Sequence, residues 1–318
     1  MAEGDTMITR RMMLSGMVAL ASLPDVVRAA TGEYVRVPVR ILPNGRVHMP
    51  VTINGQGLFR FVLDTGADCS NILDRLAQSL NLPSVSAGEA TGLGGNAVEK
   101  LYRAQSMTFG DRFHQTDVVL LGTATIGPEE SGLIAAGFLT TLPSELDYGM
   151  SEVRIYAHGS PDLAGYLKVR SRIEPGAPGL SAQIYVHATL DGVPLKLLVD
   201  TGAYDELLLF PRAVKAHGLW DKYPNPQATQ SGGVTGAVTA TRRVNIPSFA
   251  LGDVAVPNLP VTLMPPTAQQ SDIGADGLLG SQFLKLFSMA VLPSGISLRP
   301  NSRTVITPDA AAASSSSV

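Results

Sequence analysis

FRFVLDTGA at residues 59–67 decides the fold, because nearly the same stretch occurs again as LKLLVDTGA at residues 195–203. In each copy a run of mostly apolar residues, typical of a β-strand, leads straight into the tetrapeptide Asp-Thr-Gly-Ala. Aspartate and glycine favour turns, so each copy is predicted to be a strand that carries the same short loop at its end. The sequence therefore predicts an internal duplication built around two such loops.

The likeness extends outward from both loops. Before each strand stands a two-residue hairpin signal, Asn54-Gly55 in the first copy and Asp191-Gly192 in the second. After each loop come, in the same order, a short helical stretch, a glycine-rich segment and an apolar segment that contains glycine. These pairs are 74–80 with 211–217, 91–98 with 231–238, and 131–139 with 276–284. Repeated landmarks in a constant order indicate two copies of one structural unit.

Length and composition fit two lobes rich in strands. The 318 residues exceed a typical domain of about 100 to 200 residues. Hydrophobic residues make up 45% and charged residues only 16%, beside 32 glycines and 22 prolines, which suits many short strands and turns. We therefore expect an all-β fold with short helices only. The expected parts are an N-terminal lobe at 32–157, a linker at 158–165, a C-terminal lobe at 166–308 and a disordered Ala/Ser tail at 309–318.

The first 30 residues resemble a bacterial twin-arginine signal peptide. Arg10 and Arg11 precede the apolar run 12–23, and small residues allow cleavage after Ala29. The resemblance implies a periplasmic or secreted protein. The apolar run is shorter than the roughly 20 residues that span a bilayer, so no stable membrane span is expected, although an uncleaved signal would still tether the protein. The alternative is a disordered N-terminal tail in which the two arginines are not part of an export signal.

Charge and cysteine content argue against several other classes. The 24 basic residues are outnumbered by 27 acidic ones, for a net charge of -3, and no basic run stands out, so a nucleic-acid partner is not expected. Cys69 is the single cysteine and the five histidines are scattered, which argues against disulfides and a metal site. No cofactor is expected. For Cys69 the role of a small buried hydrophobe is favoured over that of a redox switch.

Two aspartates in matching loops suggest paired carboxylates. A single Asp-Thr-Gly is weak evidence, because an Asp side chain readily caps its own turn. Asp64 and Asp200, however, occur in register with a duplication of the whole lobe. Two adjacent carboxyl groups share one proton, so one can deprotonate a water while the other protonates a carbonyl oxygen. Asp64 and Asp200 are therefore the candidate catalytic residues.

The remaining residues of the two loops are predicted to support this pair. Gly66 and Gly202 would let each loop turn sharply, with backbone N–H groups directed at the carboxylates. The hydroxyl groups of Thr65 and Thr201 would form hydrogen bonds across to the opposite loop. We thus expect Thr and Gly to position the aspartates.

These motifs resemble the retropepsin-like members of the pepsin and retropepsin clan of aspartic peptidases. The resemblance rests on LDTGAD at 63–68 and DGLLG at 276–280, and it covers nearly all of residues 32–308. It implies two pseudo-symmetric β-barrel lobes with the active site between them. It further implies an aspartic endopeptidase that is complete as a monomer and cleaves polypeptides, here exported or envelope proteins. It also implies glycine-rich flaps that close over an extended peptide, formed around Gly92, Gly94, Gly95, Gly232, Gly233 and Gly236.

The sequence departs from that family in three places. Ala135 stands where the second copy and the family have glycine, here Gly280. Neither glycine-rich segment contains the tyrosine of pepsins, which favours the retropepsin style. Tyr204-Asp205-Glu206 adds two carboxylates after the second loop, and these are expected in solvent. The Ala135 methyl group could displace Asp64. The alternative to an active protease is therefore a weak or inactive module of the same fold that binds peptides.

Overall fold

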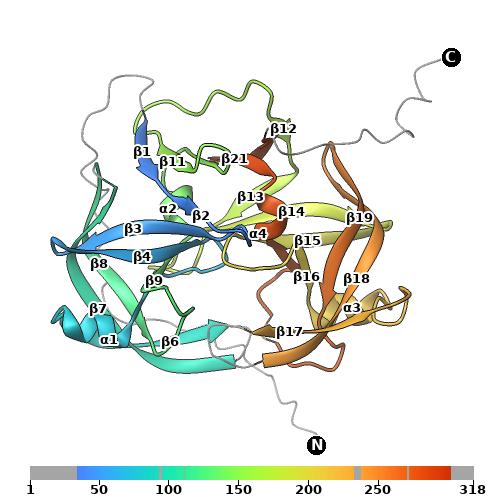
Figure 1. Cartoon of the computed structure of the whole chain (residues 1–318), viewed down its shortest axis with the longest axis horizontal. Coiled ribbons are helices and arrows are strands. Elements are labelled where there is room, and N and C mark those ends of the chain that lie inside the picture. Colours follow the sequence, from blue (N-terminus) through green and yellow to red (C-terminus); the bar gives the residue numbers. More distant parts are fainter. Residues whose placement is uncertain (1–33, 93–94, 111, 233–237, 271, 302–318) are drawn as a thin grey trace, which may run out of the picture.

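The computed structural model describes residues 34–92, 95–110, 112–232, 238–270 and 272–301, and these form two similar lobes made almost entirely of strands (Figure 1). The prediction of an all-β fold with two barrel lobes and short helices is confirmed. The expected signal peptide at 1–30 and the tail at 309–318 lie outside the described residues. Within the described residues, no helix is long and apolar enough to cross a membrane.

The first lobe is a closed barrel. Its described strands follow the order β3 (Val47–Ile53), β4 (Gln56–Asp64), β9 (Gly132–Ala135), β5 (Asn71–Leu73), β8 (Phe113–Thr123) and β7 (Gly95–Phe109). Pairing of β7 back onto β3, for example Met107 with Ile53, closes the ring. The sheet continues into β2 (Arg40–Ile41) at one end and β6 (Ser84–Gly92) at the other, and the lobe carries the helices α1 (Asp74–Ser79) and α2 (Gly137–Thr140).

The second lobe repeats this barrel. Its described strands follow the order β14 (Gln183–Leu190), β15 (Val193–Asp200), β20 (Gly277–Gly280), β16 (Leu207–Leu209), β19 (Val254–Leu263) and β18 (Val238–Leu251). Pairing of Phe249 with Leu190 closes it. The outer strands are β13 (Ser171–Glu174) and β17 (Gln227–Gly232), and the helices are α3 (Pro211–Ala216) and α4 (Ser281–Leu284). The strand order matches that of the first lobe, as the duplicated sequence predicts.

A third sheet joins the two lobes at the top of Figure 1. Its order is β1 (Val35–Pro38), β11 (Glu152–Ile155), β10 (Ser144–Asp147), β21 (Phe287–Leu292), β22 (Gly295–Pro300) and β12 (Leu167–Lys168). The lobes meet where β10 pairs with β21, and the buried Asp147 there accepts a hydrogen bond from Ser288 at 3.0 Å. The lobes are therefore connected by a continuous hydrogen-bonded sheet as well as by the chain.

The two predicted hairpin turns, and the strands that lead from them to the aspartates, are present in the structure. Asn54 and Gly55 have φ of 49° and 76°, and Asp191 and Gly192 have φ of 47° and 82°, the left-handed backbone that two-residue hairpin turns require. Each turn returns the chain along a strand whose last residues before the aspartate are continuously buried. Burial of each large apolar side chain there stabilises the fold by about 1.5–3 kcal/mol.

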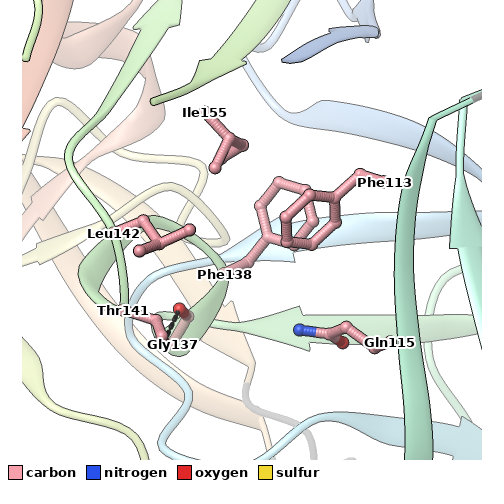
Figure 2. Close-up of a pocket in the computed structure, with 7 residues that line it drawn as sticks. All are labelled: Phe113, Gln115, Gly137, Phe138, Thr141, Leu142 and Ile155. Carbon is pink, nitrogen blue, oxygen red and sulfur yellow. Dashed lines mark hydrogen bonds between the residues drawn. The ribbon is translucent and has the colours of Figure 1, made fainter. Parts of the chain in front are cut away.

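The interior beside α2 is closely packed. Figure 2 shows the rings of Phe113 and Phe138, which meet edge to face with centroids 5.2 Å apart. A cavity of about 20 Å³ remains next to them, bordered also by Leu142 and Ile155. A space of this size holds about one water molecule. It is a packing gap and offers no room for a substrate.

Candidate active site

The fold brings Asp64 and Asp200 together between the lobes. Each is the last residue of its strand, and each strand runs parallel to a neighbour, with Asp64 opposite Ala135 and Asp200 opposite Gly280. The carboxyl group of each aspartate lies against the glycine of the other loop. A methyl group on Gly66 would lie 2.5 Å from Asp200 Cγ. The two loops therefore form one site.

Gly66 and Gly202 are required for space. A methyl group on Gly202 would likewise lie 2.5 Å from Asp64 Cγ. Neither glycine is among the described residues with positive φ, so the expected sharp turn is not the reason for glycine here. The absence of a side chain is what allows the carboxyl group of the opposite lobe to approach this closely.

Backbone N–H groups hold one oxygen of each carboxyl group. Asp64 Oδ1 accepts hydrogen bonds from the amides of Gly66 at 3.0 Å and Ala67 at 3.2 Å. Asp200 Oδ1 accepts them from Gly202 at 2.8 Å and Ala203 at 3.0 Å. The two side chains also interact directly with each other. Both carboxyl groups are thus fixed in orientation. The Oδ2 atom of each accepts none of these four hydrogen bonds.

The two threonines connect the loops beneath the aspartates. Thr65 Oγ1 donates to the carbonyl of Val199 at 2.7 Å and accepts from the Thr201 amide at 3.1 Å. Thr201 Oγ1 donates to the carbonyl of Leu63 at 2.6 Å and accepts from the Thr65 amide at 3.1 Å. Both side chains are fully buried. Four reciprocal bonds therefore fix the distance between the lobes at the site.

Burial and mutual charge set the protonation of the pair. Burial raises the pKa of Asp64 above its usual 3.8, while the hydrogen bond with Asp200 and the charge of Arg46 act in the opposite direction. Burial and the charge of Asp64 together raise the pKa of Asp200 well above 3.8. Two such close carboxyl groups titrate as a unit and hold one proton between them. The positive charge of Arg46 acts on the Asp64 side of the pair and favours ionisation there.

Arg46 makes the pair electrically asymmetric, and no sequence motif points to this residue. Its guanidinium is buried, lies 3.0 Å from Glu130 and donates to the Tyr204 hydroxyl of the other lobe at 2.6 Å. His48 approaches the same Glu130 at 3.3 Å. Strand pairing places Gln183 at the equivalent position of the second lobe. One lobe thus supplies a cation and the other a neutral amide.

Gln183 and Tyr148 are two further site neighbours that the sequence did not indicate. The Gln183 amide donates to the Gly66 carbonyl of the first lobe at 3.0 Å. Tyr148 is buried, its hydroxyl has no hydrogen-bond partner among the described residues, and its pKa is raised by burial and by the charge of Asp200. These residues lie at the site because strands that are distant in the sequence pair with each other. No short sequence motif therefore predicts them.

The expectation for the second loop was wrong. Asp205 and Glu206 do not extend freely into solvent, because Arg243 of β18 contacts both, at 3.5 Å from Asp205 and 2.5 Å from Glu206. The Thr262 hydroxyl donates a further hydrogen bond to Asp205. Both side chains are only 21% exposed. The extra carboxylates therefore belong to a local ion pair that shapes the loop.

The structure also shows how the first lobe accommodates Ala135. Gly280 lies directly against the loop that follows Asp200, where a methyl group on Gly280 would lie 2.2 Å from the carbonyl oxygen of Asp205. In the first lobe the Ala135 amide donates to the Ser70 hydroxyl at 3.0 Å, so a side chain is interposed between the two backbones. Ala135 is buried at 3% exposure, and Asp64 retains both of its amide hydrogen bonds. The methyl group therefore does not displace the aspartate.

The glycine-rich segments form hairpins on the lower side of Figure 1. Gly92 pairs with Gly95 at the end of the β6–β7 hairpin, and Gly232 pairs with Val238 in the β17–β18 hairpin. The other predicted flap residues, namely Gly94, Gly233 and Gly236, lie outside the described residues. Closure of these hairpins over a peptide stays a prediction.

Cys69 lies close to the first loop in a setting that disfavours the thiolate. Burial, with added repulsion from Asp68, raises the pKa of Cys69 to about 12. Since the thiolate is the reactive form, this argues against a redox switch, and the residue itself is half-buried, not fully buried as expected. In the part of the chain that the structure describes, no cluster of three or more His, Cys, Asp or Glu side chains is placed to hold a metal ion.

Comparison with known proteins gives one informative result. A family model described as aspartyl protease matches residues 49–138 and 186–283. Each matched segment contains one Asp-Thr-Gly-Ala loop and the parallel strand beside it. A search of curated proteins finds no match.

Proposed function

The chain belongs to the aspartyl protease family, and on this premise we propose that it is an endopeptidase whose catalytic pair is Asp64 and Asp200. The observation that carries the proposal is the reciprocity of the site. Each carboxyl group lies against the glycine of the opposite loop and is oriented by two amides of its own loop. Such a pair needs both lobes, which one chain supplies.

The proposed reaction uses the two aspartates in different protonation states. Asp64, as the ionised member, removes a proton from a water molecule as its oxygen attacks the peptide carbonyl carbon. Asp200 donates its proton to the carbonyl oxygen, giving a neutral tetrahedral diol. Asp64 then passes the proton that it took from the water to the nitrogen, while Asp200 takes back a proton from a diol hydroxyl. Cleavage of the C–N bond releases an amine and a carboxylic acid and returns both aspartates to their starting states. Arg46 supports this assignment, because its positive charge favours ionisation of Asp64.

Preorganisation supports turnover over simple peptide binding. The carboxyl groups are held by backbone amides and by the Thr65 and Thr201 bonds before any substrate arrives, so little reorganisation is needed during the reaction. Ala135, the residue that suggested an inactive module, is accommodated without loss of the Asp64 contacts. The geometry thus favours the enzyme over the binding module.

Substrate, assembly and location are further parts of the proposal. An extended polypeptide would add its backbone to the β6–β7 and β17–β18 hairpins, and side-chain pockets would set the specificity. A monomer would suffice, since both aspartates lie on one chain. The twin-arginine pattern at residues 1–30 supports export, so exported or envelope proteins are the proposed substrates.

Cleavage of a diverse peptide library by residues 31–318, from acidic to neutral pH, tests the proposal. We expect cleavage that Asp64→Asn and Asp200→Asn each abolish, while Asp221→Asn, at a side chain 84% exposed, retains it. Circular dichroism confirms that each variant is folded. Full activity in either site variant would refute the paired mechanism. Absence of cleavage by a folded wild-type protein that still binds library peptides would establish the binding module instead.

A further inference from the structure

Three neighbouring segments place basic side chains side by side on the outside of the second barrel. Arg170 precedes β13, His187 lies on β14 and Lys196 lies on β15, and these strands are adjacent in the sheet (Figure 1). The His187 amide donates to the Arg170 carbonyl at 2.8 Å, and His187 is paired with Lys196 in the register of β14 and β15. The three residues therefore form one row across the strands.

This row lines a surface groove of about 460 Å³. Thr189 and Pro194 form another part of its wall, and the backbone at Gly252 completes it. We call the groove lined by Arg170, His187 and Lys196 the cationic groove. Its volume is many times that of the packing gap in the first lobe and is sufficient for a small ligand.

The charges around the groove are only partly compensated. Lys196 is paired with Glu174 at 2.8 Å and lies over the ring of Tyr185, 4.0 Å from its centre. Among the described residues, neither Arg170 nor the neighbouring Arg172 has a carboxylate partner. The pKa of His187 is lowered by burial and then by the charges of Arg170, Lys196 and Arg172, against an opposing effect of Glu174. The cationic groove therefore has an excess of positive charge, which Arg170 and Arg172 supply.

The first lobe offers an internal comparison. Its register pairs Pro50 with Arg60, the residue four positions before Asp64, just as the second lobe pairs His187 with Lys196, four positions before Asp200. Arg60 is neutralised by Glu129 at 2.8 Å. The same barrel is thus built without a basic row. Among the described residues, the cationic groove occurs in the second lobe and has no counterpart in the first, so the fold does not require it.

We infer that the cationic groove is a binding site for a phosphate group. A guanidinium presents paired N–H donors that match phosphate oxygens, and an ammonium adds a compact positive charge. The Thr189 hydroxyl in the wall is a further donor to such a ligand. The phosphate belongs either to a soluble anion or to the headgroup of an anionic lipid, and both present the same oxygens to the row. This site is separate from the catalytic pair and does not depend on the proposed protease activity.

Titration of the imidazole of His187 by NMR, in the full chain, tests the inference. The signal is assigned with His187→Gln, and inorganic phosphate is compared with chloride at equal ionic strength. Bound phosphate favours protonated His187, so its pKa should rise in a saturable way with phosphate. Arg170→Gln should weaken this binding about fivefold, the effect of one partly exposed charge contact. Arg60→Gln, at the corresponding strand of the first lobe, should leave it unchanged.

A second arm identifies the source of the phosphate. The protein is sedimented with vesicles of phosphatidylglycerol and, as a control, of phosphatidylcholine. Cosedimentation with the anionic vesicles that Arg170→Gln reduces assigns the site to a lipid headgroup, whereas a response to inorganic phosphate alone assigns it to a soluble anion. Absence of both responses, or equal responses in wild type and Arg170→Gln, would overturn the inference.

Discussion

Replacement of Thr65 by valine should weaken the contact between the two Asp-Thr-Gly loops and lower the stability of the protein. The hydroxyl donates to the Val199 carbonyl and accepts from the Thr201 amide, and valine has the same shape with no polar atom. Two buried backbone groups then lose their partners, at about 1–3 kcal/mol each. The expected loss is therefore about 2–6 kcal/mol, a large share of a typical total stability of about 5–15 kcal/mol.

The assay is urea unfolding of Thr65→Val beside Thr65→Ser, which keeps the hydroxyl and loses only a methyl group, worth about 1 kcal/mol. Peptide cleavage is measured under native conditions on the same samples. A displacement of the loops by about 1 Å would lower activity by about a hundredfold, so Thr65→Val should be far less active than Thr65→Ser. A valine variant no less stable than the serine variant would refute the reasoning that these bonds hold the lobes at the site.

Three further outcomes follow from the same geometry. Asp200→Asn should abolish cleavage yet raise the melting temperature at neutral pH: the raised pKa of Asp200 means that wild-type stability falls as pH rises through it. This gain should vanish below the usual pKa of 3.8, and thermal unfolding at both pH values checks it; an unchanged melting temperature at neutral pH would contradict it. Arg46→Gln should move the acid limb of the kcat/KM profile to higher pH, because the cation lowers the pKa of Asp64; a limb that stays in place would contradict this. Gly280→Ala should destabilise the protein by about 1–3 kcal/mol through overpacking, while Ala135→Gly in strand β9 should cost about 1 kcal/mol or less; urea unfolding that gives the reverse order would contradict this.

Much of the fold was predictable because its signals are local. The Asn54-Gly55 and Asp191-Gly192 turns, the apolar strands and the repeated order of landmarks are each readable within a few residues. Their repetition made the two-lobe arrangement predictable as well. The position of Asp64 against Asp200 follows from the same symmetry, although their catalytic role stays a prediction.

The remainder depends on contacts between distant parts of the chain. Arg46 meets Glu130 across 84 positions and Tyr204 across 158, and neither spacing forms a motif. Arg243 reached Asp205 only because β18 passes beside the second loop, which is why the solvent interpretation was wrong. Such partners depend on how barrels close and pack, and hydrophobic periodicity does not specify this.

The sheet shared by the lobes has a consequence for any attempt to divide the molecule. Separating the halves at the connection between β11 and β12, or producing either barrel alone, would expose the edge of β10 or β21, whose N–H and C=O groups pair across the junction. Unprotected edge strands recruit other strands. An isolated half would therefore pair with a second copy of itself or aggregate. The smallest unit expected to fold without aggregating contains two halves, whether they are encoded in tandem or contributed by separate chains.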